Sequence, residues 1–203
     1  LPELDLDAGK AWISSGDFRK QLEAELHTDD FNLVKLLLLR LDNDHLVDFI
    51  EHGSFDRQEA GNYTLEEFRQ QVDQFDAIIP EEDLLPPYMV DVLKQYHQAE
   101  SNPDRVEVER EIADRYYDHI MEHGNAFLKE FSQFEYNMAN LLTYIEAGNH
   151  ATDPWKFISG NTTFVQHLRE DSSVTMAASA GFEMFNEITC YAELPFLAEK
   201  EMR

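Results

Sequence analysis

Apolar residues recur at helical spacing along most of the chain. Val108, Ile112, Tyr116 and Ile120 follow one another at steps of four, and similar stripes occur on both sides of this run. No window alternates strictly between polar and β-branched apolar residues, as a half-buried strand would. The pattern therefore predicts an all-α protein, built as a multi-helix array with strands as a minor addition at most.

Start and stop signals divide the first half of this pattern into separate helices. Small polar residues predict helix caps at Ser15 and Thr28. A break is expected at Asp42–Asn43, and Gly53 is placed to end the short helix that follows. Thr64–Glu67 fits a capping box, in which the Thr and Glu side chains satisfy each other's backbone donors.

The second half carries signals of the same kind. Pro87 is suited to the first turn of a helix, and Asn102–Pro103 predicts both a domain boundary and the start of the longest helical pattern. Gly124–Asn125 is expected to bend that pattern. A short helix is predicted around Phe164 to Leu168, and a last amphipathic run covers about residues 176–191.

One helical stretch occurs twice. Residues 30–37 and 135–142, at a spacing of 105, both read acid, aromatic, Asn, apolar, two variable positions, Leu, Leu. This repetition predicts one domain over residues 1–203, formed by two repeated lobes at about 1–100 and 101–203. Asn32 and Asn137 are then expected at equivalent places, each buried and hydrogen-bonded. The alternative is a chance match between two leucine-rich helices.

Acidic residues dominate both halves of the chain. Asp and Glu number 41 against 16 Lys and Arg, giving a formal net charge of -25. Such a surface repels nucleic-acid phosphates and anionic lipid headgroups, so neither direct nucleic-acid binding nor a polybasic membrane contact is expected. No direct membrane insertion is predicted either. A basic protein partner suits the charge better. Solubility alone is the competing explanation.

Cysteine content and hydropathy bear on the compartment. The single Cys190 excludes an internal disulfide framework and a four-cysteine zinc site, and it suits the reducing cytoplasm. Its apolar, aromatic surroundings favour an inert core thiol over a nucleophile. No apolar run reaches the 18 residues of a membrane span. The final Glu199–Arg203 reads as the start of another helix, so we expect a fragment of a longer chain.

The sharpest catalytic pattern is the stretch His119-Ile120-Met121-Glu122-His123. It matches the inverted zinc-protease motif, in which two His residues bind zinc and the Glu activates water. A helix would place both His side chains on one face. Because eight His and 41 acids make such a coincidence common, solvated side chains on an amphipathic helix are the preferred interpretation. We therefore predict no catalytic residue, cofactor or bound metal, with a zinc-dependent hydrolase as the alternative.

Five stretches of the chain resemble a known family. They are Leu1–Leu4, Leu41–Leu46, Gly61–Glu67, Leu85–Tyr88 and the block from Tyr116 to Gly148. Together they resemble an uncharacterised bacterial family encoded in V/A-type ATPase operons. That family is similar to the ATPase subunit called C in prokaryotes and d in vacuoles.

The resemblance implies a helical protein built from repeated lobes. It also implies a non-catalytic subunit or assembly factor of a proton- or sodium-translocating V/A-type ATPase, which couples or seats the central rotor stalk. The implied partners are the central stalk and the membrane rotor ring. The expected location is the cytoplasm, with peripheral attachment at the inner face of the cell membrane through the ATPase. A free-standing acidic helical adaptor protein is the remaining alternative.

Overall fold

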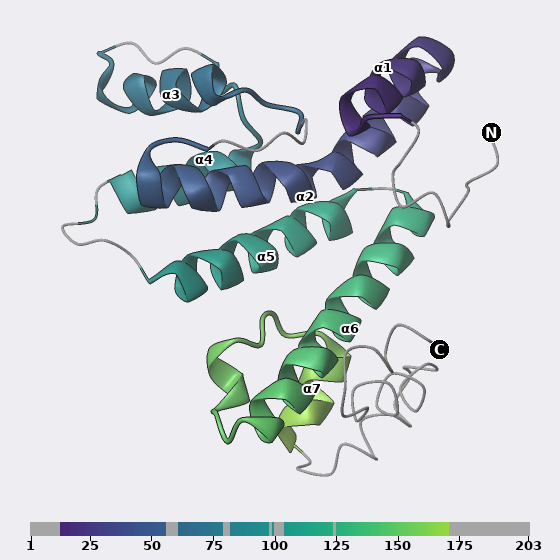
Figure 1. The fold of residues 1–203 in the computed structure, drawn as a ribbon, viewed down its shortest axis with the longest axis vertical. Coiled ribbons are helices and arrows are strands. Elements are labelled where there is room, and N and C mark those ends of the chain that lie inside the picture. Colours follow the sequence, from purple (N-terminus) through teal and green to yellow (C-terminus); the bar gives the residue numbers. More distant parts are fainter. Residues whose placement is uncertain are drawn as a thin grey trace. The chain divides into compact units, whose positions relative to one another are not determined.

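The computed structural model describes residues 13–55, 61–78, 82–97, 99, 104–123 and 125–170. Over these ranges the backbone consists of helices and their connections, without a strand, as predicted (Figure 1). The chain divides into two compact units, Leu1–Asn102 and Pro103–Arg203, called unit 1 and unit 2 below. The α-helices are α1 (Ser15–Glu25), α2 (Thr28–His52), α3 (Leu65–Asp73), α4 (Pro87–His97), α5 (Arg105–Glu122), α6 (Ala126–Asn149) and α7 (Thr163–Glu170).

The first two helices of unit 1 each begin one residue earlier than the predicted caps imply. Ser14 caps α1, and its side chain accepts a hydrogen bond from the backbone N–H of Asp17. His27 caps α2 by accepting from Asp29 through Nδ1. A neutral imidazole nitrogen can replace the usual hydroxyl or carboxylate oxygen because it also carries a free acceptor lone pair.

The predicted break at Asp42–Asn43 is wrong, because α2 continues without interruption to His52. Asp and Asn disrupt helices by competing for backbone groups of their own turn. Here both side chains are engaged by other segments: Asp42 bonds the turn at residues 61–63, and Asn43 accepts from the hydroxyl of Tyr88 at 2.7 Å. The predicted end at Gly53 is confirmed, with φ at 67° in the left-handed region that glycine favours.

The core of unit 1 lies where α3 and α4 pack against α2. Leu46, Phe68 and Met89, one from each helix, are fully buried. The capping box predicted for α3 is present, with Thr64 and Glu67 bonding each other's backbone N–H. As predicted, α4 begins at Pro87. The buried Gln71 ties α3 to the chain that precedes α4, since its side chain accepts from Leu84 and donates to Asp83.

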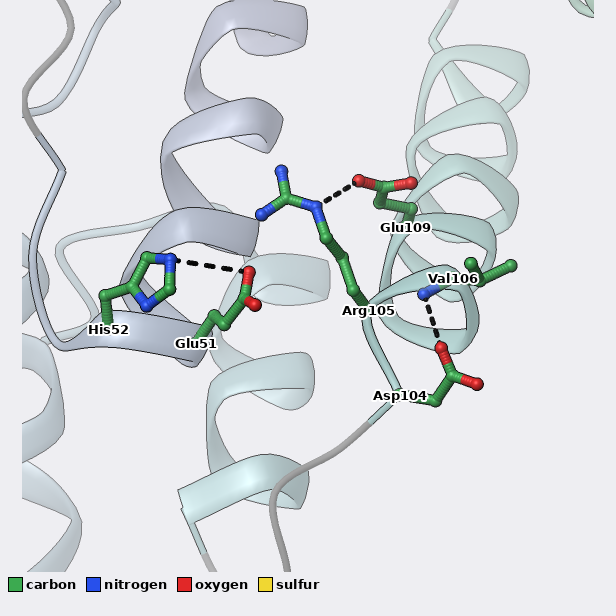
Figure 2. Close-up of polar contacts among 6 residues, drawn as sticks. All are labelled: Glu51, His52, Asp104, Arg105, Val106 and Glu109. Carbon is green, nitrogen blue, oxygen red and sulfur yellow. Dashed lines mark hydrogen bonds and ion pairs between the residues drawn. The ribbon is translucent and has the colours of Figure 1, made fainter.

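Unit 2 begins with α5, whose start differs from the prediction. The cap is Asp104 rather than Asn102, and its carboxylate accepts from the backbone N–H of Val106 at 2.9 Å (Figure 2). Arg105 then pairs with Glu109 one turn later, at 2.8 Å. An acid at the start of a helix is a stronger cap signal than the Asn at 102, since it also favours the helix dipole.

In unit 1, Figure 2 also shows the exposed pair of Glu51 and His52 at the C-terminal end of α2.

The longest helix of unit 2 is α6, capped by Asn125 after the bend predicted at Gly124–Asn125. The chain then passes through the short 3₁₀ helix η3 (Pro154–Lys156) into α7, which lies beside the C-terminal half of α6 (Figure 1). Leu141, Phe164 and Leu168 form the buried cluster between α6 and α7. The short helix predicted around Phe164 to Leu168 is confirmed.

Several predictions concern residues beyond the described ranges. They include the amphipathic run at 176–191, Cys190 and the terminal stretch 199–203. Across the residues that the structure describes, no helix combines the length and apolarity needed to cross a membrane.

Candidate functional site

Two of the sequence stretches that carry the family resemblance meet inside unit 1. Asp42 of α2 is completely buried, and its carboxylate accepts from the backbone N–H of Tyr63 at 3.1 Å and from the Asn62 side chain at 2.7 Å. Burial raises the pKa of Asp42, although these hydrogen bonds oppose the shift. The buried carboxylate therefore holds the turn that leads into α3.

The backbone of this turn approaches α2 closely. A Cβ atom at Gly61 would collide with the Asp42 carboxylate, which explains glycine at that position. From the other side, the Arg19 guanidinium of α1 donates to the carbonyl oxygen of Gly61. Three helices of unit 1 thus converge on one turn, and a guanidinium covers it.

A neutral amide performs the same task in unit 2. Asn140 of α6 is 4 % exposed. Its amide donates to the carbonyl oxygen of Ser159 and accepts from the N–H of the same residue, both at 3.0 Å. One α6 turn earlier, Asn137 accepts from the hydroxyl of Thr162 at 2.9 Å, and that hydroxyl accepts in turn from Val165 of α7. The two amides fix the turn that leads into α7.

The two units repeat with a spacing of 98 residues. Asp42 and Asn140 are each the fifteenth residue of their long helix. The same 98 residues separate further features, namely the long-helix caps His27 and Asn125, the short-helix caps Thr64 and Thr162, the short-helix starts Leu65 and Thr163, and the positive-φ residues Gly53 and Ala151. Agreement at caps, helix starts and backbone conformation shows a repeated local structure.

The spacing of 105 predicted from the sequence is therefore wrong. Asn32 is the fifth residue of α2 and is exposed, whereas Asn137 is the twelfth residue of α6 and is buried and hydrogen-bonded. The expectation for Asn137 is confirmed, and the one for Asn32 is not. The similar residue types align the two long helices seven residues, or about two helix turns, out of register with the alignment given by the turns they hold.

Unit 2 contains an open pocket of about 690 Å³ beside the turn at residues 158–162. Its charged lining consists of Arg110, Asp114 and Asp118 from α5 and Arg169 from α7. Its aromatic lining consists of Tyr117, Tyr136 and Trp155. This is the strongest candidate for a functional site in the described residues, since its volume lies in the range of ligand pockets, about 300–1,000 Å³.

Side chains of α5 and α6 contact one another in the pocket lining. The Tyr136 hydroxyl donates to the Asp114 carboxylate, and the Tyr136 ring stacks on Tyr117 with centroids 4.5 Å apart. Burial raises the pKa of both Asp114 and Tyr136, while hydrogen bonds to Asp114 from Tyr136 and from the Gly160 backbone oppose its shift. Gly160 has φ at 73°, and a Cβ there would lie 2.6 Å from Cε1 of Tyr136.

Side chains of η3 and α7 also contact one another in the pocket lining. The Arg169 guanidinium lies over the ring of Trp155, 5.5 Å from its centroid. Trp155 is half-buried and also packs against Tyr144. Arg110 of α5 donates to the carbonyl oxygen of Lys156 at 3.3 Å. The pocket lining therefore combines guanidinium donors, carboxylates and aromatic rings.

The zinc-motif residues do not form the expected helical pair. Helix α5 ends at Glu122, and His123 has an extended backbone with its Nδ1 accepting from Asn125. His119 is half-buried within the helix, and this burial lowers its pKa. Within the described ranges, no three His, Cys, Asp or Glu side chains converge as a metal site requires.

A family described as "Protein of unknown function (DUF2764)" matches residues 1–203. The chain belongs to this family. No curated protein and no solved structure shows significant similarity to it.

The pocket of this DUF2764 protein was not predicted from its sequence. A signal existed in Arg110, Asp114 and Asp118, which are spaced by four and therefore share one face of α5. Their convergence with Tyr136 and Arg169 depends on how α5, α6 and α7 pack. Helical periodicity places charges on a face, but it does not identify the residues across from it.

Proposed function

We propose that this protein is a non-catalytic subunit or assembly factor of a V/A-type ATPase, where it couples or seats the central rotor stalk. Its task is to bind other subunits, with no chemical step of its own. The bound surfaces are those of the central stalk and the membrane rotor ring. This proposal extends the resemblance of the sequence to the C-type subunit.

The repetition of one helical unit at a spacing of 98 residues carries the proposal. Each copy has a long helix, a turn held by a buried side chain of that helix, and a short helix capped by Thr64 or Thr162. The resemblance implies a protein assembled from repeated helical lobes. Duplicated helical units commonly act as binding scaffolds, because their outer faces can vary while each core is kept.

One contact between the family-like stretches and the charge of the whole chain agree with a scaffold role. Leu41–Leu46 and Gly61–Glu67 meet in the buried Asp42 contact, so these stretches maintain the unit. The net charge of -25 favours association with basic protein surfaces, to which it would contribute mainly speed and specificity of binding. Both features suit a protein selected for partner binding.

Affinity capture tests the proposal directly. Tagged full-length protein, recovered in mild detergent from cells that encode it, should bring down V/A-type ATPase subunits above the level of a tagged, unrelated helical protein of similar net charge. Recovery without any ATPase subunit would contradict the proposal. A wash at about 0.5 M salt distinguishes the proposal from the adaptor alternative, because exposed charge pairing is strongly screened at that ionic strength. Loss of one basic, non-ATPase partner under that wash would favour the adaptor.

A further inference from the structure

Two charged groups of the unit 2 pocket remain available for a ligand. Asp114 is occupied by Tyr136 and Gly160, and Arg110 bonds the Lys156 carbonyl. By contrast, among the described residues Arg169 makes a cation–π contact with Trp155 but no hydrogen bond or ion pair, and Asp118 makes no hydrogen bond or ion pair either. Both are exposed and line the same pocket. The pocket thus presents one available cation and one available anion.

The rings beside these charges define what each can hold. The Arg169 guanidinium lies over the Trp155 ring, 5.5 Å from its centroid, and its N–H groups can pair with a carboxylate. Asp118 adjoins Tyr117, whose pKa it helps to raise, and Tyr117 stacks on Tyr136. A carboxylate beside stacked aromatic rings suits a guanidinium or ammonium group.

Unit 1 shows a guanidinium at the corresponding place. Arg19 lies 98 residues before Tyr117, and it donates to the turn that Asp42 holds. In unit 2 the position is a tyrosine, and the pocket lies open beside the equivalent turn. Unit 2 thus supplies no guanidinium from this position, and a basic group of another molecule can lie beside its turn.

We propose that the unit 2 pocket binds a segment of a partner protein that carries a basic side chain and, nearby, an acidic one. The basic group lies against Asp118 and the Tyr117–Tyr136 stack, and the acidic group lies on Arg169. A protein segment fits better than a small metabolite because the lining is polar and Asp118, Gln133, Asn161, Thr163 and Arg169 are exposed. Only the partner's identity as an ATPase subunit rests on the proposed function.

Site-specific crosslinking in full-length protein tests this site. A photoreactive phenylalanine derivative replaces Gln133, which is exposed on α6 and lines the pocket. The matched control replaces Ala139, which is exposed on the same helix outside the pocket. After irradiation in cells that encode the protein, mass spectrometry should identify one partner peptide with a basic and an acidic residue. We expect it at position 133 in about tenfold excess over position 139.

Charge variants then test the two contacts. In protein that carries the photoreactive residue at position 133, Asp118→Asn and Arg169→Gln should each lower the crosslink yield about three- to tenfold. This is the effect expected for loss of a charge pair at a binding surface. Arg169→Lys should restore only part of the loss, since Lys keeps the charge but not the planar fork on Trp155. Glu170→Gln, on the neighbouring exposed residue of α7, is the control and should keep full yield. Circular dichroism verifies that each variant is folded.

The outcomes separate this inference from the proposed function. Equal yields at positions 133 and 139, full yield in Asp118→Asn and Arg169→Gln, or a crosslinked small molecule would each overturn the pocket assignment. If ATPase subunits are captured while any of these results holds, the proposed function stands and the pocket assignment fails. A charge-dependent crosslink to a protein outside the ATPase would support the pocket and contradict the proposed function.

Discussion

In both units a buried side chain of the long helix holds the turn before the short helix, but the two side chains differ in chemistry. In unit 1 the buried group on the long helix is the carboxylate of Asp42, and in unit 2 it is the amide of Asn140. The difference follows from what each turn presents. Asp42 faces two donors, the Tyr63 N–H and the Asn62 side chain, whereas Asn140 faces both the N–H and the carbonyl oxygen of Ser159. A carboxylate only accepts, while an amide does both.

The surroundings of the two turns differ more than the turns themselves. Arg19 covers the unit 1 turn, whereas a pocket of about 690 Å³ adjoins the unit 2 turn. Holding the turn is therefore a requirement of the repeated unit, and the space beside it can vary. That separation allows the space beside the turn to be occupied by Arg19 in one copy and to form a pocket in the other.

Removing the amide of unit 2 should have the largest effect. Asn140→Ala leaves a buried N–H and a buried carbonyl oxygen of Ser159 without partners, and we expect a loss of about 4 kcal/mol in the free energy of unfolding. Chemical denaturation measures it. Asn161→Ala, at an exposed residue of the same turn, should cost less than about 0.5 kcal/mol. Equal losses in both variants would show that the amide does not hold the turn.

Adding a methyl group to the unit 2 turn should have the next largest effect on stability. Gly160→Ala places a Cβ against Tyr136 in a left-handed conformation, so we expect a cost of about 3 kcal/mol by the same measurement. Gly148→Ala, within α6 and with no atom near its Cβ, should instead stabilise by about 0.5–1 kcal/mol. If the two substitutions had the same sign, the close approach of the turn to Tyr136 would be disproved.

The pH dependence of stability should reveal the buried acid beside the pocket. Because burial raises the pKa of Asp114 in the folded state above 3.8, the carboxyl contributes stability that is present below 3.8 and lost as pH rises through its folded pKa. The Asp114→Asn variant has no carboxyl at this position, so it does not lose this stability as pH rises. Its stability relative to the unsubstituted protein should therefore rise with pH from 3.8 towards neutrality. Denaturation at a series of pH values measures the difference, and a fall over this range would contradict the assignment.

The smallest effects are expected from substitutions at Ala151 and Gly53, the positive-φ residues that follow the two long helices. Ala151 has φ at 50°, a region that costs an L-residue energy, while its counterpart Gly53 has φ at 67°. Ala151→Gly should raise the free energy of unfolding by about 0.5–1 kcal/mol. Gly53→Ala should lower it by a similar amount, although no atom lies near its Cβ. Thermal melting detects both, and opposite signs are the decisive result.

Local signals were sufficient to predict much of the fold. The Thr64–Glu67 capping box, the start at Pro87 and the end at Gly53 are properties of a few neighbouring residues, and all are present. The break at Asp42–Asn43 was predicted wrongly because the side chains satisfy groups 20 or more residues away. A contact across such a separation leaves no periodic mark in the sequence.

The candidate site was largely beyond sequence reasoning for the same reason. The motif at His119–His123 is local and conspicuous, yet α5 ends within it. The pocket combines residues from α5, α6, η3 and α7, and Gly160 is explained only by its distance from Tyr136. The spacing of the repeat is a further example. Similarity of residue types predicts a spacing of 105 residues, whereas the helix caps and turn contacts give 98.

The position of Trp155 gives the pocket an intrinsic optical reporter. The chain has two tryptophans, so Trp12→Phe would leave Trp155 as the single indole fluorophore. Its ring lies between the Arg169 guanidinium and Tyr144, half-buried at the pocket wall. A carboxylate that engages Arg169 would change the charge above the ring and its contact with water. Emission intensity and wavelength would then follow occupancy of the pocket in solution, without a label and separately from events in unit 1.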